Sequence, residues 1–514
     1  MLVDTQYLRN SQKLVVSYID KSGDVKLKYF DWTDPFKYEI CEPNDPHREK
    51  QYKSWDGKSI KKVRSFPDRY SIYEFLDALP EEETKDIFAY YEPNLFFIDI
   101  EVEVKDGFPE PSEAPTEIQS LSIVYDNKII IMGTKELKKS SQEEIMEGNI
   151  KSGGDIKGVK KYFKDYNLDN YEFRYIKYDD EFDMLYNLFN KMLPKMPAIT
   201  GWNFIDFDWQ FLVNRARKLS KTVGGKTYHI NPAKSSYTNR LNNIWGTDYE
   251  IPAHKIIFDY MQLYNSLDTS VKVKESASLD FVSKALLGVK KIEYDGSLMD
   301  LYTEDYTKFI YYNAVDSVLV QLIHKKMMYM NIIYAISSLS RIKITDVFNH
   351  MNNSLASLAI TEGVLRGKFR KQEGIILFKD RNKNNSGAGG ISGGWVKEPN
   401  VGMNRWVACY DFASLYPTVQ RQFFIAPENY KGVLNKKNKE TCINEAGDIV
   451  PIDSNDVVCT NGVVFRKRSS PTLQMLEDVY ADRKKHKYLM MDKKNELSKV
   501  EEEITKLENE LELS

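Results

Sequence analysis

Acidic residues recur along the first two thirds of the chain in patterns that suit metal binding. Asp99 and Glu101 alternate in the apolar run LFFIDIEVEV, so on a strand both carboxylates would point to one face. Asp208 follows in NFIDFD, and Tyr312 and Asp316 lie four residues apart in YNAVD, so on a helix they would share one side. Clustered carboxylates repel one another unless a cation lies between them, and ligands made only of oxygen suit Mg²⁺ or Mn²⁺. Two such ions could promote phosphodiester hydrolysis, with Tyr312 orienting the attacking water.

Each of these short patterns also has a simpler interpretation. A single pair of alternating acids usually belongs to a solvated strand face, and a Tyr-x-x-x-Asp spacing is common by chance. Their order along the chain, on segments with strand and helix patterns, favours the metal site. Glu103 and Asp206 are additional acids, which we interpret as solvated or as neighbours of the ligands.

The elements that must position these residues follow the order of an α/β protein. The apolar run at 95–104 is typical of a buried strand. Further strands are expected at 14–19, 25–30, 120–125 and 128–132, helices at 180–193, 209–219 and 304–330, and a hairpin or long loop at 221–250. This order predicts an α/β domain over about 96–330.

Two segments of the C-terminal part have clear local signals. The segment WVACYDFASLYP, residues 406–417, predicts a strand followed by a turn. From Pro471 to about Leu511 the chain has no further proline or glycine, which predicts one helix about 60 Å long. Between the two halves, the Gly- and Ser-rich stretch at 384–394 is the best candidate for a domain boundary.

Composition excludes several classes of protein. With 514 residues, 42% of them hydrophobic, the chain can form about three domains with substantial cores, which excludes a disordered protein. A net charge of −3 excludes a uniformly basic protein, and the four cysteines form no C-x-x-C pair. We therefore expect a cytoplasmic protein without disulfides or zinc. No apolar run approaches the roughly 20 residues of a membrane span, so no membrane partner is expected.

The three acidic patterns together resemble a known set of motifs. FIDIE, GWNFIDFD and YNAVD are similar to the exonuclease motifs of family B DNA polymerases of the T-even-like phage type. The resemblance implies a 3′→5′ proofreading exonuclease with an RNase H-like fold. Asp99, Glu101, Asp208 and Asp316 would be its metal ligands, and Tyr312 would position the water.

The segment DFASLYPT resembles polymerase motif A of the same family, whose usual form is DxxSLYPS. The resemblance implies that Asp411 binds both catalytic metal ions and that the turn at Ser414 and Leu415 presents backbone amides to a nucleoside triphosphate. Tyr416 would stack under the incoming sugar, and Thr418 replaces the usual serine. The alternative is a turn with a packed aromatic side chain.

Two further segments resemble parts of the same family. GISGGWVKEP is similar to the linker between the exonuclease and polymerase domains, in which Gly393 and Gly394 would let the backbone approach the template strand; Ile391 replaces the usual aromatic residue. VYADRKKHKYLM is similar to the first helix of the fingers. Arg483 and Lys487 would there hold the triphosphate from one helix face, although a solvated basic face has the same pattern.

Other family motifs do not occur in the sequence. Motif B, with its lysine and Asn-Ser-x-Tyr-Gly, and the Asp-Thr-Asp of motif C after Asp411 are absent, so the match covers about the first half to three-fifths of the family. The side chains that form a coiled-coil-like stripe, spaced 3, 4, 3 and 4 apart, are Leu497, Val500, Ile504, Leu507 and Leu511. We therefore expect the N-terminal subunit of a split polymerase, whose partner chain carries motifs B and C. A piece of a longer, continuous polymerase would have the same sequence.

The expected fold class is a multidomain mixture of α/β and α+β. An N-terminal domain would cover 1–95 and return at about 331–375, and the exonuclease domain would cover 96–330. A partial palm would follow at 376–468, and an incomplete first fingers helix at 469–514.

The expected activity depends on the partner. Alone, the chain should digest single-stranded 3′ ends with two Mg²⁺ or Mn²⁺ ions. With its partner it should act as a DNA-directed DNA polymerase on primer–template and dNTPs, and would reach a sliding clamp through that partner. The alternatives are a free-standing 3′→5′ exonuclease with a vestigial palm and an inactive nucleic-acid-binding regulatory scaffold.

Overall fold

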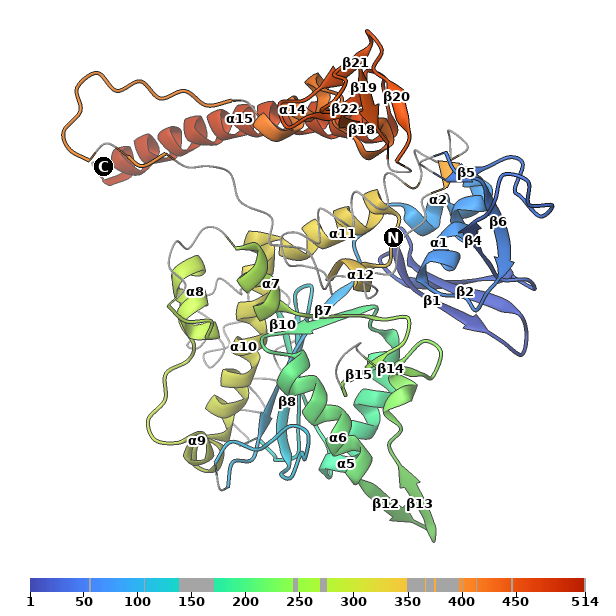
Figure 1. The fold of residues 1–514 in the computed structure, drawn as a ribbon. Coiled ribbons are helices and arrows are strands. Elements are labelled where there is room, and N and C mark those ends of the chain that lie inside the picture. The colour runs from blue at the N-terminus through green and yellow to red at the C-terminus, as the bar shows by residue number, and fades with distance from the viewer. Residues whose placement is uncertain are drawn as a thin grey trace. The chain divides into compact units, whose positions relative to one another are not determined.

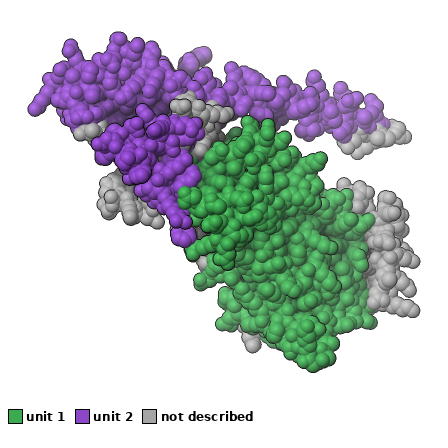
Figure 2. All heavy atoms as spheres, turned by 90° about the vertical axis from the view of Figure 1, so that its right-hand side faces the viewer, with its two compact units in different colours: residues 1–35, 67–363 green, residues 36–66, 364–514 purple. Residues whose placement is uncertain are grey.

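The chain forms two compact units in a computed structural model. One unit comprises Met1–Pro35 and Pro67–Gly363, and the other comprises Phe36–Phe66 and Val364–Ser514 (Figure 2). The residues that the structure describes are 1–54, 57–105, 107–137, 171–243, 248–268, 275–348, 366, 374–375, 397–399, 401–412, 414–444 and 447–512. The mixed α/β and α+β class predicted from the sequence is confirmed, and the finer division into four parts stays a prediction.

A six-stranded sheet forms the centre of the first unit (Figure 1). β7, β8 and β9 are antiparallel neighbours, whereas β10 runs parallel to β9, and β11 lies parallel to both β7 and β16. In sheet order the strands are β10 (Glu172–Lys177), β9 (Lys128–Gly133), β8 (Ile118–Tyr125), β7 (Leu95–Val102), β11 (Ala198–Gly201) and β16 (Ile256–Asp259). The strands predicted at 95–104, 120–125 and 128–132 are therefore confirmed.

Alternation along β7 divides its side chains between two apolar cores. Phe97 belongs to the core that contains helix α10 (Tyr306–Met327), and Ile98 and Ile100 belong to the core that contains α5 (Glu181–Asn187) and α6 (Gln210–Lys218). Because successive strand residues face opposite sides, Asp99 and Glu101 share the face of Phe97, toward α10. The β-branched and aromatic residues of β7 thus both form the sheet and aim its acids at one helix.

The remaining elements of the first unit surround this sheet. The antiparallel strands β1 (Leu2–Leu8), β2 (Lys13–Ile19) and β3 (Val25–Asp31) confirm the expected strands at 14–19 and 25–30. The expected helix at 304–330 is interrupted at Asp305, since α9 ends at Glu304 and α10 begins at Tyr306. The other helices and hairpin strands are α1 (Arg69–Ala78), α2 (Glu81–Phe88), α7 (Tyr260–Leu267), α8 (Leu279–Leu287), α9 (Leu298–Glu304), α11 (Tyr329–Ser340), α12 (Ile344–Phe348), β12 (Ser220–Val223), β13 (Lys226–His229), β14 (Leu241–Asn243) and β15 (Glu250–Pro252).

The second unit contains a small antiparallel sheet and a long helix. Helix α15 (Pro471–Glu512) confirms the single long helix predicted from the sequence, and α14 (Leu415–Gln422) packs against it. The sheet strands, in sheet order, are β20 (Ile449–Pro451), β19 (Thr441–Ile443), β18 (Tyr430–Leu434), β22 (Val463–Arg466) and β21 (Asp456–Val458). Two further strand pairs occur among the described residues of this unit: β4 (Phe36–Ile40) with β6 (Ile60–Arg64), and β5 (Lys53–Ser54) with β17 (Gly374–Ile375).

The strand expected in 406–417 is wrong. Residues 406–412 have no strand structure and no ladder partner among the described residues, and the main chain becomes regular only at α14. The indole of Trp406 is 99% exposed and the ring of Tyr410 is 95% exposed. A run of strand-forming residues becomes a strand only where a neighbour completes its hydrogen bonds, and no described strand does so here. Among the described helices, none is long and apolar enough to span a bilayer.

Candidate active site

Three of the predicted acids come together between β7 and α10. Asp99 and Glu101 lie on β7 and Asp316 lies on α10, and one carboxylate oxygen from each lies within 4.8 Å of the others. The sequence pattern explains this arrangement, because alternation on the strand places both acids on the face that α10 covers. Asp316 is buried, and Asp99 is half-buried.

The fourth predicted acid, Asp208, lies beside this cluster on a separate element. It is buried in the π-helical turn Ile205–Trp209, which connects β11 to α6. Its Oδ1 accepts a hydrogen bond of 3.0 Å from the N–H of Ile100, and Asp259 Oδ2 accepts one of 3.2 Å from the N–H at the start of the turn. These two bonds hold the turn between β7 and β16. Burial, followed by the charge of Asp99, raises the pKa of the Asp208 carboxyl, which indicates that the two carboxylates interact.

A glycine permits the close approach of the turn that carries Asp208. A Cβ atom at Gly201, the last residue of β11, would collide with the carbonyl oxygen of Ile98 and with the ring of Phe204. Glycine lets β11 lie against β7 where the chain turns toward Asp208.

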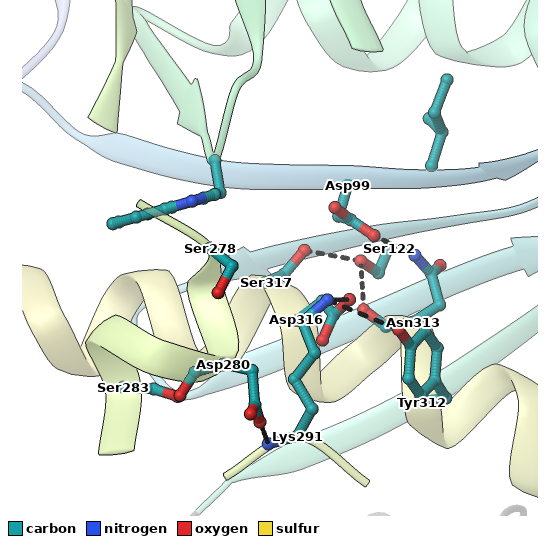
Figure 3. Close-up of polar contacts among 12 residues, drawn as sticks. Asp99, Ser122, Ser278, Asp280, Ser283, Lys291, Tyr312, Asn313, Asp316 and Ser317 are labelled. Carbon is teal, nitrogen blue, oxygen red and sulfur yellow. Dashed lines mark hydrogen bonds and ion pairs between the residues drawn. The ribbon is translucent and has the colours of Figure 1, made fainter. Parts of the chain in front are cut away.

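Lys291 is part of the site, although sequence reasoning did not identify it. Its Nζ lies 2.5 Å from Asp316 Oδ2 and 3.4 Å from the hydroxyl of Tyr312 (Figure 3). Its backbone N–H donates a 3.0 Å hydrogen bond to Asp280 Oδ1, which fixes the segment that carries it. Burial alone would lower the pKa of Lys291, but Asp316 raises it above the usual value, so the ammonium stays charged.

Tyr312 faces this ion pair, as its i, i+4 spacing with Asp316 predicts. Its ring packs edge-on against Tyr294, with ring centroids 5.3 Å apart. Burial raises the pKa of the Tyr312 hydroxyl above its usual value, and Asp316 raises it further. The hydroxyl therefore stays protonated and can donate a hydrogen bond beside the carboxylates.

Asn313 is the second residue that sequence reasoning missed. It is fully buried on α10, and its Nδ2 donates a 2.6 Å hydrogen bond to Asp99 Oδ2 (Figure 3). Its Oδ1 accepts from the hydroxyl of Ser120, and its backbone carbonyl accepts from the hydroxyl of Ser122. The carboxamide is thus held from β8 and can fix the orientation of Asp99. It lies within the YNAVD pattern, so the signal was present but assigned to its neighbours.

The electrostatics of the cluster fit a divalent cation. Burial, followed by the charge of Asp316, raises the pKa of Asp99 to about 8, and burial together with the charge of Asp99 raises the pKa of Glu101. Burial also raises the pKa of Asp316, and Lys291 offsets part of this effect. Asp316 Oδ1 is buried and has no hydrogen-bond partner among the residues that the structure describes. An unpartnered carboxylate oxygen among crowded acids is the environment that a bound cation stabilises, and the all-oxygen donors suit Mg²⁺ or Mn²⁺.

The second predicted constellation is only partly assembled. Asp411 is exposed in the irregular segment before α14, and the side chains of Leu415 and Tyr416 are also exposed. Arg483 Nη1 lies 3.4 Å from Ser414 Oγ, so α15 brings this arginine to the turn predicted to hold a triphosphate. Lys487 is exposed one turn further along α15. Gly393 and Gly394 lie outside the described residues, and their role stays a prediction.

Comparison with known proteins identifies relatives along most of the chain. Residues 74–281 match the exonuclease domain of DNA polymerase family B, and residues 356–506 match DNA polymerase family B. The DNA-directed DNA polymerase of Escherichia phage RB69 is 27% identical over 404 residues, which is 76% of this chain and 42% of the relative. That of Enterobacteria phage T4 is 26% identical over 339 residues, 65% of this chain and 35% of the relative. DNA polymerase 1 of Saccharolobus solfataricus is 24% identical over 456 residues, 84% of this chain and 46% of the relative. The chain thus spans less than half the length of these relatives.

Proposed function

Because the chain belongs to family B of the DNA polymerases, we propose that its first unit removes nucleotides from DNA 3′ ends in a metal-dependent reaction. One observation carries this proposal: three carboxylates meet within 4.8 Å, and one buried oxygen among them has no hydrogen-bond partner in the described part of the chain. The proposed substrate is a single-stranded 3′ end, as expected for proofreading.

The proposed reaction assigns a task to each side chain. Two Mg²⁺ or Mn²⁺ ions would be held by four carboxylates, those of Asp99, Glu101, Asp208 and Asp316. When bound, the ions would activate a water molecule and stabilise the leaving 3′ oxygen. Lys291 holds Asp316 Oδ2, and Asp316 Oδ1 has no hydrogen-bond partner among the described residues, so it stays available to a cation.

Two neutral side chains complete the proposed site. The protonated hydroxyl of Tyr312 can orient water or a phosphate oxygen by donating a hydrogen bond. Asn313 holds Asp99 in one rotamer through its 2.6 Å hydrogen bond, which prepares this ligand for metal binding.

The test compares two variants on a 5′-labelled single-stranded oligonucleotide in Mg²⁺. The double variant Asp99→Ala with Glu101→Ala should lose digestion from the 3′ end but keep DNA binding, which rests largely on phosphate contacts elsewhere. Glu103→Ala is the matched control, since this acid follows β7 and pairs with Lys105 outside the cluster. Digestion by the double variant at the wild-type rate would refute the site.

A second function, template-directed DNA synthesis, is favoured by the surface around Asp411. Trp406, Tyr410 and Phe412 are exposed in a segment that has no strand partner among the described residues. Exposed apolar rings on an unpaired segment mark a surface that another chain segment covers. We propose that a second chain with motifs B and C supplies the neighbouring strands and the further carboxylates that a two-metal site needs.

The long helix offers the same proposed partner a second contact. Leu497, Val500, Ile504 and Leu507 are all about half exposed on α15 and lie on one stripe. The first helix of the partner would lie antiparallel along this stripe and complete the fingers. Arg483 and Lys487, on the same helix, would then contact the incoming dNTP.

Primer extension tests this second proposal. The purified chain alone should not extend a primer, and extension should require both the partner and Asp411. The variant Asp411→Asn should abolish extension in the complex without slowing 3′ digestion. Extension by the purified chain alone would reject the split arrangement. Normal extension by the Asp411→Asn complex would reject the assignment of Asp411 to the synthesis site.

A further inference from the structure

One stretch of the first unit is strongly basic, although the whole chain carries a net charge of −3. From Trp209 to Asn243 the sequence contains no aspartate or glutamate. Its seven basic residues are Arg215, Arg217, Lys218, Lys221, Lys226, Lys234 and Arg240. Arg215, Arg217 and Lys221 form ion pairs with acids from outside the stretch. The other four basic side chains have no ion pair among the described residues, so the stretch keeps a positive potential that attracts anions.

The fold arranges this stretch around a cleft of about 500 Å³. The cleft lies between the end of α6, the short turn at Pro232–Ser235 and the hairpin β14–β15. The ribbon β12–β13 leaves α6 next to it and projects from the unit (Figure 1). The volume of the cleft is within the range of ligand pockets, about 300–1,000 Å³.

Several polar groups of the cleft are available to a ligand. Arg240 is exposed and has no ion pair among the described residues, and the carboxamide of Asn239 beside it has no hydrogen-bond partner among them. Asn231 uses Oδ1 to accept the N–H of Ala233 at 3.0 Å, which leaves its NH₂ group free to donate. Guanidinium and carboxamide groups together can contact a phosphate and the edge of a base.

The other residues that line the cleft determine its polarity and its shape. Arg217 pairs with Glu250, whose carboxylate is the one acidic group among the described residues that line the cleft. The side chains of Ile230 and Pro232 are buried at its wall and offer an apolar surface. The cleft therefore combines a cationic rim with an apolar wall on which a planar base could lie.

We propose that this cleft binds a nucleoside phosphate, with Arg240 and Arg217 on the phosphate and the carboxamides of Asn231 and Asn239 on the base. None of these residues belongs to the carboxylate site, so binding here does not depend on the nuclease. The ligand is either one unit of a nucleic-acid strand or a free nucleotide. The exposed side chains of Lys226 and Tyr228 on β12–β13 continue the basic surface and favour the strand.

The test measures binding by the full-length chain in EDTA, where no metal-dependent digestion can occur. Fluorescence anisotropy with a labelled single-stranded oligonucleotide tests the strand, and calorimetry with a deoxynucleoside monophosphate tests the free ligand. Arg240→Gln should weaken binding about tenfold and reduce the salt dependence by about one phosphate contact. Arg174→Gln is the matched control, because Arg174 is exposed on β10 and has no ion pair among the described residues.

A second variant gives a change of opposite sign. Glu250→Gln removes the carboxylate and frees Arg217, so binding should become tighter, which loss of folding cannot mimic. Binding of the oligonucleotide alone would identify a strand site, and comparable binding of the monophosphate would identify a nucleotide site. If Arg240→Gln and Glu250→Gln both bind like Arg174→Gln in the two assays, the cleft is no nucleotide site. The rate of 3′ digestion by the wild-type chain in Mg²⁺ is measured separately. This rate tests the carboxylate site and not the cleft.

Discussion

Replacing Asn313 with alanine should weaken metal binding without removing any metal ligand. The carboxamide donates to Asp99 Oδ2 at 2.6 Å from a fully buried position, and Ser120 holds its other end. A hydrogen bond to a charged group contributes about 1.5–3 kcal/mol, which corresponds to roughly 10- to 100-fold in affinity. We therefore expect the Mg²⁺ concentration for half-maximal 3′ digestion to rise by at least about tenfold, because Asp99 is no longer held in place.

The control for this variant lies on the same helix. Gln321→Ala also removes a buried carboxamide from α10, which accepts from the Tyr171 hydroxyl at 2.6 Å and donates to the Asp126 carbonyl at 2.8 Å. Both variants should lose stability in denaturant titrations, but only Asn313→Ala should need more Mg²⁺. If the two variants had the same Mg²⁺ requirement as the wild type, Asn313 would support only the packing of α10 and our reasoning about Asp99 would be wrong.

Three further predictions concern charge and surface. Lys291→Met leaves Asp316 buried and unpaired, so it should destabilise the protein by about 3–5 kcal/mol in EDTA, and Mg²⁺ should stabilise this variant more than the wild type. Burial lowers the pKa of Lys255 to about 7, so between pH 7 and about 10 the unfolded chain holds a proton that the folded chain lacks. The free energy of unfolding should therefore rise with pH in this window, by up to about 1.4 kcal/mol per pH unit relative to Lys255→Met, in denaturant titrations at pH 7, 8 and 9. Changing Val500 and Ile504 to aspartate should weaken association with the proposed partner chain about tenfold or more in calorimetry and leave 3′ digestion unchanged.

The carboxylate site was predictable because its spacing follows from local geometry. Alternation places Asp99 and Glu101 on one face of β7 whatever the rest of the chain does, and the i, i+4 spacing places Tyr312 and Asp316 on one side of α10. What sequence reasoning added was only the assumption that the helix covers that face of the strand. The packing of α10 on β7 and β8 satisfies this assumption.

Lys291 could not be predicted in the same way. It lies 25 residues before Asp316, in an irregular segment after α8, and no periodic pattern connects the two. Nothing in the sequence distinguishes this lysine from the many others, because its contact with a buried acid exists only in the tertiary fold. The cleft at Arg240 could not be predicted for the same reason: a helix end, a short turn and a hairpin form it, and only the tertiary fold brings them together.

The segment before Asp411 shows where local patterns mislead. Its aromatic and β-branched residues have strand propensity, but such propensity mainly measures how well a side chain fits a sheet that already exists. No described strand pairs with residues 406–412, and their rings are exposed. By contrast, β7 has the same kind of composition and becomes a strand because β8 and β11 lie on either side of it. The carboxylate cluster is therefore assembled by strands and a helix of this chain, whereas no described strand fixes the segment that carries Asp411.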